Sequence, residues 1–317
     1  MTTVYFDSKL PEHERRARLF RGDVFVFSPR ASSLALASFA HGMLQEAFAT
    51  DAPECAQYTM PVERFVEAFA PVKPQFIHHP RTKDLVRAMA ADFACDLNET
   101  YLDVPRLRGV TSDGYLTSGV GYAHHAHRDS WYAAPMAQLN WWIPLSSFDS
   151  ASALAFLPRF TERPIANSSH EFNYYDWNTV GRQAAASQVK SDTRKQPKAL
   201  EPLDLSDEVR VVCEPGGIIL FSGSLLHVTV PNTTGRTRFS IDLRTVNGRD
   251  LAEGAGMPNV DSAPQGTSLR DFVRGADGAA MPEEWIQRYE NVAPRADQVV
   301  VFKPDTAAPP PSDNQAA

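Results

Sequence analysis

Cysteine is scarce in this chain. Its 317 residues include three cysteines, Cys55, Cys95 and Cys213, which are widely spaced and form no C-x-x-C pair. An odd number of distant thiols argues against a disulfide framework, and unpaired cysteines exclude a zinc site built from C-x-x-C pairs. We therefore expect the protein to lie in a reducing, cytoplasmic compartment.

Long apolar runs and a surplus of basic residues are also missing. No stretch approaches 18 apolar residues, and the amino-terminal segment MTTVYFDSKLPEHERRARLF is charged and has no apolar core. These features predict neither a membrane span nor a secretory signal. The 31 Lys and Arg residues face 38 Asp and Glu residues, a net charge of −7 that disfavours binding to nucleic acid. A local basic pocket for an anionic small molecule is still compatible with this balance.

Helical patterns dominate the first hundred residues. Residues 22–29 read as a short strand of β-branched and aromatic residues, bounded by Gly and Pro. Residues 32–49 and 81–97 then carry apolar residues at the spacing of amphipathic helices. We expect residues 1–104 to form a mainly helical support, with one strand, for a sheet that follows.

The pattern changes to short strands at about residue 105. Turn residues separate segments of alternating or continuous apolar character at 119–129, 137–147, 208–215, 216–223, 227–232 and 236–246. Short strands with frequent Gly and Pro are typical of a sandwich or barrel. The sequence therefore predicts a mainly β fold with flanking helices, whose core is a jelly roll (double-stranded β-helix, cupin-like) at 105–246.

A long polar insertion interrupts these strands at about 159–206. Insertions of this length are usually lids, binding loops or disordered segments, and the aromatic run HEFNYYDWN at 170–178 favours a lid. After a carboxy-terminal segment at 247–304, the Pro- and Ala-rich tail at 305–317 has nothing to bury, so we expect it to be disordered. Residues 1–304 then form one catalytic domain.

The stretch HHAHRDSWY at 124–132 suggests a metal site. If it is a strand, alternation places His125, His127 and Asp129 on one face, and His124 on the opposite face. His227, which follows the apolar strand GGIILF, is a candidate third ligand from a distant part of the barrel. Two imidazoles and one carboxylate on one side of an Fe(II) ion leave positions open for a chelating co-substrate and for O₂. A chance H-x-D pair is the alternative.

A second polar pattern follows His227. In a strand at 235–244, Arg238 and Ser240 share one face with Asp242 and Arg244. A guanidinium with a hydroxyl group beside it is well suited to hold a carboxylate. Arg244 or Arg236 could take the same role, and a solvent-facing edge strand would explain the pattern without any ligand.

The ordered motifs His127-x-Asp129, His227 and Arg238-x-Ser240 resemble those of the Fe(II)/2-oxoglutarate-dependent oxygenases. The eleven-residue step from His227 to Arg238 and the run PGGIILFSGSLLH at 215–227 are most similar to the phytanoyl-CoA dioxygenase-like branch. The resemblance covers about residues 105–246. It implies that His127, Asp129 and His227 are catalytic iron ligands and that Arg238, assisted by Ser240, binds 2-oxoglutarate.

The same resemblance implies a reaction. The chain is expected to oxidise, most simply to hydroxylate, a C–H bond of a small molecule with O₂ while 2-oxoglutarate is decarboxylated to succinate and CO₂. Coenzyme A thioesters, amino acids and small secondary metabolites all fit as substrates. A cupin-type isomerase or hydrolase that uses the same triad without 2-oxoglutarate is one alternative, and a non-catalytic jelly-roll binding module is another. The sequence gives no indication of the oligomeric state.

Further residues are expected around this site. Gln138 and Asn140 would place buried amides near the co-substrate, although backbone groups could equally satisfy them. The remaining candidates are assigned to the substrate pocket, with core packing as the alternative for the aromatic ones: His125, Trp131, Tyr132, Tyr174 and Trp177.

Overall fold

The computed structural model describes residues 2–121, 123–181 and 191–290. Its first part contains β1 (Val4–Phe6), α1 (Glu12–Leu19), β2 (Val24–Phe27), α2 (Ala31–Phe48), α3 (Val62–His78) and α4 (Pro80–Asp92). The predicted strand at 22–29 and the predicted helices at 32–49 and 81–97 are confirmed to within a few residues. The sequence reading missed α1 and α3, and α3 carries two internal prolines, Pro71 and Pro74.

The remaining strands and helices include the predicted strands at 137–147, 208–215, 216–223, 227–232 and 236–246, together with others that the sequence did not predict. They are β3 (Thr100–Leu102), β4 (Arg106–Val110), β5 (Leu139–Pro144), β6 (Leu154–Phe156), α5 (Tyr174–Asp176), β7 (Val209–Val211), β8 (Ile218–Ser222), β9 (His227–Thr229), β10 (Arg238–Asn247), α6 (Gly248–Glu253), β11 (Val273–Arg274) and α7 (Glu283–Glu290). The prediction of a strand at 119–129 is wrong for the described residues of that segment. There, pairing with other segments is limited to one isolated bridge at His127 and single backbone hydrogen bonds at Gly121, His124 and Asp129.

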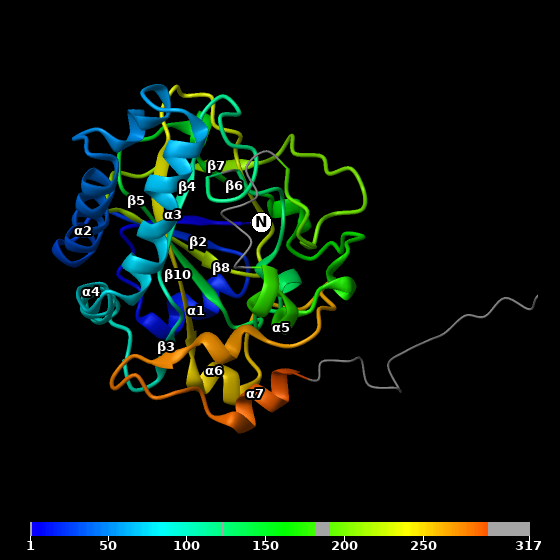
Figure 1. The fold of residues 1–317 in the computed structure, drawn as a ribbon. Coiled ribbons are helices and arrows are strands. Elements are labelled where there is room, and N and C mark those ends of the chain that lie inside the picture. The colour runs from blue at the N-terminus through cyan, green and yellow to red at the C-terminus, as the bar shows by residue number, and fades with distance from the viewer. Residues whose placement is uncertain (1, 122, 182–190, 291–317) are drawn as a thin grey trace, which may run out of the picture.

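Two sheets form the core (Figure 1). The larger has the strand order β1-β2-β8-β5-β10-β3-β11, and β4 also pairs with β10. The smaller has the order β7-β6-β9. Apart from the parallel pair β1–β2, the pairs are antiparallel. This mainly β core with flanking helices is the jelly roll that the sequence predicts.

Strand β10 lies between the helical layer and a polar cavity. Phe239, Ile241 and Leu243 are fully or almost fully buried in the main apolar cluster, which includes residues of α2, α3 and α4. These helices cover one side of the sheet in Figure 1. The alternate residues of β10 line a cavity on the opposite side: Arg238, Ser240, Asp242 and Arg244. The predicted alternation along this strand is therefore confirmed, and it gives one apolar face and one charged face.

Helix α3 packs very close to β4. A Cβ atom built on Gly109 of β4 would lie 2.9 Å from the Phe69 ring of α3 and 3.1 Å from the Phe239 ring of β10. Both rings are buried, and they meet edge to face with centroids 5.3 Å apart. The absence of a side chain at Gly109 therefore sets how near α3 lies to the sheet, and with it the position of the cavity residues that α3 carries.

The predicted insertion at 159–206 is partly described. It contains short helical turns at Pro158–Phe160 and Ser169–Glu171, then α5 and a π-helical turn at Trp177–Gly181. Residues 182–190 of the insertion and the predicted disordered tail at 305–317 lie outside the described residues. Within the described part of the chain, no helix combines the length and apolar character needed to cross a bilayer.

A glycine-to-alanine pair tests the contact between α3 and the sheet. We expect Gly109→Ala to lower the free energy of unfolding by about 1–3 kcal/mol, because the added methyl group overpacks two buried rings. Gly42→Ala is the matched control, since a Cβ at Gly42 in α2 would meet no atom within 4 Å. It should raise the free energy of unfolding by about 0.5–1 kcal/mol. Urea denaturation measures both, and equal effects would contradict the tight contact.

Candidate metal centre and adjoining cavities

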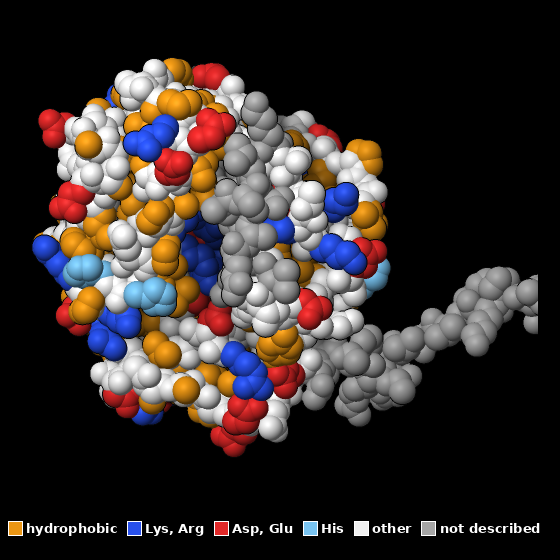
Figure 2. Space-filling view, in the orientation of Figure 1, with side chains coloured by type: hydrophobic (Ala, Val, Ile, Leu, Met, Phe, Trp, Pro, Cys, Tyr) orange, Lys and Arg blue, Asp and Glu red, His pale blue; other side chains and the backbone are white. Residues whose placement is uncertain are grey.

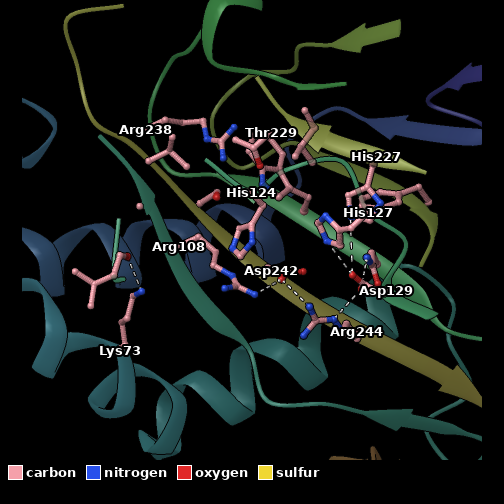
Figure 3. Close-up of a pocket in the computed structure, with 18 of the residues that line it drawn as sticks. Lys73, Arg108, His124, His127, Asp129, His227, Thr229, Arg238, Asp242 and Arg244 are labelled. Carbon is pink, nitrogen blue, oxygen red and sulfur yellow. Dashed lines mark hydrogen bonds and ion pairs between the residues drawn. The ribbon is translucent and has the colours of Figure 1, made fainter. Parts of the chain in front are cut away.

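His127, Asp129 and His227 converge in space. Each offers one ligand atom, and these atoms all lie within 4.8 Å of one another. The Nε2 atoms of His127 and His227 lie 3.4 Å and 3.9 Å from Asp129 Oδ1. Neighbouring ligands of an ion with bonds of about 2.1 Å lie on the order of 3 Å apart. The three side chains, which point toward one another in Figure 3, therefore need only small movements to hold one metal ion.

Backbone pairing brings the two histidines together. His127 N donates to His227 O at 2.9 Å, and His227 N donates to His127 O at 3.0 Å. Asp129 N donates to Gly223 O at 2.7 Å, and Asp129 begins a short 3₁₀ helix, Asp129–Tyr132. The H-x-D pair is thus held by a single bridge and a turn, and not by the continuous strand that the sequence predicts.

Each histidine presents its Nε2 atom to the site. His127 Nδ1 lies 2.7 Å from His125 O, and His227 Nδ1 lies 2.8 Å from Leu225 O. A carbonyl oxygen only accepts, so both Nδ1 atoms carry the proton and both Nε2 lone pairs are available to a metal ion. Burial and the neighbouring His127 lower the pKa of His227 to about 4, which keeps its ring neutral at neutral pH.

Asp129 is ionised and held in one orientation. Its Oδ2 accepts hydrogen bonds from Gln138 Nε2 at 2.8 Å, from Asn140 Nδ2 at 2.8 Å and from Arg244 Nε at 3.2 Å. Burial acts to raise the pKa of Asp129, but the Arg244 guanidinium opposes it, and that pKa lies well below its ordinary value. Oδ1 is left facing the imidazoles.

The amides of Gln138 and Asn140 therefore serve the carboxylate. The sequence suggests that these residues contact the co-substrate, whereas in the structure their NH₂ groups both donate to Asp129. Gln138 also donates to Asn140 Oδ1 at 2.9 Å, which fixes the direction of both amides. Asn140 additionally lines the cavity described next.

Arg238 and Ser240 line a cavity of about 80 Å³ together with the three candidate ligands. Arg238 is 5% exposed and donates from Nη1 to Ser152 O at 2.5 Å. Its Nε and the Ser240 hydroxyl are buried and have no hydrogen-bond partner among the described residues. Burial lowers the pKa of Arg238 to about 9, and its guanidinium lies 5.1 Å from the centre of the Trp142 ring. An anion in this cavity would satisfy both groups.

Arg244 and Arg236, the two alternatives to Arg238 for binding a carboxylate, already pair with carboxylates of the protein. Arg244 bonds Asp129 and Asp242, each at 3.2 Å, and lies 3.5 Å from Asp103. Arg236 is 57% exposed at its side chain and binds Glu54 at 2.6 Å. Of the three candidates, only Arg238 combines burial with an unmatched charge among the described residues.

A larger cavity of about 300 Å³ adjoins the triad. Tyr132, Tyr174 and Trp177, which the sequence suggests as substrate contacts, all line it, and Phe172 lies beside them. Figure 2 shows a hollow on this face of the molecule with Lys and Arg side chains at its floor. The cavity thus has an aromatic part, contributed by the insertion, and a basic part.

Trp131 and His125 do not line either cavity. Trp131 is fully buried and donates from its indole to Asp261 Oδ1 at 2.8 Å. Asp261 also binds the buried Arg128 at 3.1 Å, so the residues on both sides of Asp129 are anchored to one carboxylate. His125 is exposed, and its Nε2 lies 2.7 Å from Pro197 O.

The cavities also contain residues that the sequence analysis did not identify, and three of them carry charge or a titratable ring. His124, Arg108 and Lys73 line both cavities. Strand alternation predicts that His124 faces away from the site, which is wrong because this segment is not a strand. Arg108 lies on β4, where alternation with Gly109 and Val110 could have indicated its direction. Lys73 lies on α3 between two prolines, where the sequence gives no signal.

The chain matches the phytanoyl-CoA dioxygenase (PhyH) family over residues 44–240. No curated protein matches it in sequence. Similar solved structures include EvdO2 from Micromonospora carbonacea var. aurantiaca complexed with 2-oxoglutarate, at 16% identity over 55% of this chain and 62% of that chain, with a TM-score of 0.34. The similarity thus spans less than two thirds of EvdO2.

Two further structures have comparable scores. The nickel complex of the non-heme monooxygenase ThoJ is 15% identical over 76% of this chain and 80% of that chain, with a TM-score of 0.37. The non-heme alpha ketoglutarate dependent epimerase SnoN from nogalamycin biosynthesis is 13% identical over 74% and 84%, also with a TM-score of 0.37. The match to the phytanoyl-CoA dioxygenase family model spans residues 44–240. That match covers more than half of the chain, which therefore belongs to the phytanoyl-CoA dioxygenase family.

Proposed function

We propose that this protein is an Fe(II)- and 2-oxoglutarate-dependent oxygenase that hydroxylates a C–H bond of a small molecule. The observation that carries the proposal is a shared cavity. The carboxylate of Asp129 and the imidazoles of His127 and His227 converge in this cavity. The same cavity is lined by the buried guanidinium of Arg238 and the hydroxyl of Ser240, whose Nε and Oγ atoms have no hydrogen-bond partner among the described residues. Family membership supports the same chemistry.

The donor set fits a ferrous ion. Two neutral imidazole nitrogens and one carboxylate oxygen form the 2-His-1-carboxylate set of non-haem iron oxygenases, which leaves coordination positions open. Backbone carbonyls fix both imidazoles, and three donors fix the carboxylate. Such outer hydrogen bonds make ligands more basic and hold them in place. His127, Asp129 and His227 would hold the iron.

The rest of the cavity fits 2-oxoglutarate. This co-substrate carries a carboxylate at each end, and Arg238 Nε and Ser240 Oγ are two unsatisfied donors buried in the same cavity as the triad. Charge-assisted hydrogen bonds to a carboxylate would compensate the burial of Arg238. A hydrolase or isomerase without 2-oxoglutarate, or a simple binding module, would need a different anion in this cavity to match the buried cation.

In the proposed reaction, iron and 2-oxoglutarate supply the oxidising chemistry, with succinate and CO₂ as the products of the co-substrate. The protein's residues bind and orient. Arg238 and Ser240 set the position of the co-substrate's distal carboxylate. Arg244, Gln138 and Asn140 keep Asp129 charged and pointed at the metal site. The walls of the larger cavity would exclude water and direct one C–H bond toward the triad.

Removal of the carboxylate ligand should abolish turnover. We expect Asp129→Ala to lose Co(II) binding, with Co(II) standing in for iron, and to form no succinate from 2-oxoglutarate in the Fe(II)-supplied enzyme. Absorbance titration and succinate release measure these effects. Asp51→Ala, at an exposed position, is the charge-matched control and should retain both properties. Wild-type succinate release by Asp129→Ala would remove Asp129 from the ligand set.

Removal of the Arg238 guanidinium should weaken binding of the co-substrate and leave metal binding unchanged. Arg238→Met should raise the KM for 2-oxoglutarate about tenfold or more while Co(II) affinity stays close to that of the wild type. The reason is that the guanidinium faces the cavity but makes no hydrogen bond to the three ligands. Arg236→Met removes an exposed guanidinium and should leave KM unchanged. An unchanged KM in Arg238→Met would mean that another cation binds the carboxylate.

Replacement of Gln138 distinguishes a role in holding the metal ligand Asp129 from a role in binding the co-substrate. Its NH₂ group bonds Asp129, and the residue does not line the smaller cavity. Gln138→Leu should therefore lower Co(II) affinity by about 10- to 100-fold. The KM for 2-oxoglutarate at saturating iron should change little. The opposite pattern, with normal metal affinity and a raised KM, would favour the direct co-substrate contact that the sequence suggests.

A further inference from the structure

The turn that carries Asp129 has little backbone support from the sheets. From His127 to Asp129, the backbone bonds to other segments are the bridge between His127 and His227 and the hydrogen bond from Asp129 N to Gly223 O. A strand would repeat such bonds along its length, whereas this segment passes into a 3₁₀ helix at Asp129. The orientation of this candidate ligand therefore depends on what the side chains next to it bind.

Those side chains bind Asp261. The side chain of Asp261 is 3% exposed, and its carboxylate accepts hydrogen bonds from Arg128 Nε at 3.1 Å and from Trp131 Nε1 at 2.8 Å. Arg128 directly precedes Asp129, and Trp131 follows it by two residues. One buried carboxylate thus holds the chain on both sides of Asp129. Charge-assisted hydrogen bonds of this kind are strong where water is excluded.

Arg128 also reaches the segment of the second histidine. Its guanidinium is almost fully buried, and it donates to Ser224 O at 2.8 Å, three residues before His227. It further donates to Phe160 O at 2.5 Å. Among the hydrogen-bond partners of Arg128 in the described part of the chain, Asp261 is the charged one, since the others are backbone carbonyls. Asp261 therefore matches the buried charge that keeps these segments together.

Asp261 binds the insertion as well. Its carboxylate accepts from Ile165 N at 3.1 Å, and its backbone oxygen accepts from Asn167 Nδ2 at 2.9 Å. Farther along the same segment, Gln265 N donates to Phe172 O at 2.9 Å, and Phe172 lines the larger cavity. One stretch of chain therefore contacts both the turn that carries a metal ligand and the wall of the adjoining cavity.

We propose that Asp261 is a positioning residue for the metal centre. Its carboxylate holds Arg128 and Trp131, and through them it keeps Asp129 in the orientation in which Oδ1 faces the two imidazoles. Asp261 lines neither cavity, so it acts only through these neighbours. Its effect on metal binding rests on the proposed oxygenase function, whereas its effect on the turn does not depend on a bound metal.

The test combines metal affinity with local amide exchange in the full chain. Asp261→Asn keeps the shape of the side chain and removes the charge that faces Arg128. We expect this variant to bind Co(II) about tenfold or more weakly than the wild type, with altered visible absorption bands that report a changed ligand geometry. In the metal-free protein, mass spectrometry should show that residues 128–134 take up deuterium about tenfold faster.

A pair of tryptophan variants separates positioning from stability. Trp131→Phe keeps an aromatic ring and removes one hydrogen bond to Asp261, and its Co(II) affinity should fall by about 2- to 10-fold. Trp141→Phe is the matched control, because Trp141 is equally buried and its indole donates to Thr245 Oγ1 at 3.0 Å in the apolar layer under the helices. Trp141→Phe should lower the Tm to a similar extent but leave Co(II) affinity and the exchange of residues 128–134 unchanged.

Three results would overturn the proposal. The first is wild-type Co(II) affinity in folded Asp261→Asn, or in Trp131→Phe if thermal melts show that Asp261→Asn does not fold. The second is an equal loss of Co(II) affinity in Trp131→Phe and Trp141→Phe, which loss of stability alone would explain. The third is unchanged amide exchange of residues 128–134 in the variant that is folded.

Failure of this proposal differs from failure of the oxygenase function. If the iron-supplied wild type forms no succinate, the oxygenase function is contradicted, while a loss of Co(II) affinity in Asp261→Asn still supports the positioning role. If the wild type does not bind Co(II) either, amide exchange in the metal-free protein decides whether Asp261 holds the turn. Normal succinate formation by the wild type, with an Asp261→Asn variant that binds metal normally, would remove only the positioning role.

Discussion

The buried charge of Asp129 is the constraint on which the site depends. A carboxylate taken out of water costs several kcal/mol unless cations and hydrogen-bond donors compensate it. Here Arg244 supplies the cation, two amides supply the donors, and two imidazoles face the remaining oxygen. Arg244 and Asn140 are opposite each other in the register of β10 and β5. Sheet pairing therefore places the groups that keep this carboxylate ionised.

The remaining cations of the cavities fall into two groups. Arg106, Arg108, Arg194 and Arg244 are matched by carboxylates, so they shape the walls and set the local field. Arg238 and Lys73 have no carboxylate partner among the described residues, and each lines a cavity that reaches the triad. Arg238 is buried, so an anionic ligand such as the proposed 2-oxoglutarate would stabilise its charge.

The sequence predicts the triad and β10 well because their signals are local and strong. The types and order of His127, Asp129, His227 and Arg238 carry chemistry whatever the backbone does. Along β10, a fully apolar face makes the direction of each polar side chain unambiguous. Where a strand is paired on both edges and packs one face in the core, the alternation of side chains between its two faces can be predicted from the sequence.

The same reasoning fails at 119–129 because that segment lacks a continuous partner strand. With one bridge at His127 and a 3₁₀ turn from Asp129, side chains do not alternate, so His124 enters the cavities and His125 does not. A 3₁₀ helix turns about 120° per residue, which carries Trp131 away from the site and toward Asp261. Lys73 reaches the cavity only through the packing of α3 on the sheet, and no local pattern encodes such a long-range contact.

Asp261 sets a boundary on what can be cut from the chain. It lies beyond the residues matched by the family, 44–240, yet it accepts from Arg128 and Trp131 on either side of Asp129. Arg244 and strand β2, which pairs with β8, also fall outside the matched range. A fragment trimmed to that range would retain the three ligands but lose their counter-charge and their anchor. The smallest autonomous unit of this enzyme is therefore larger than its recognisable motif region.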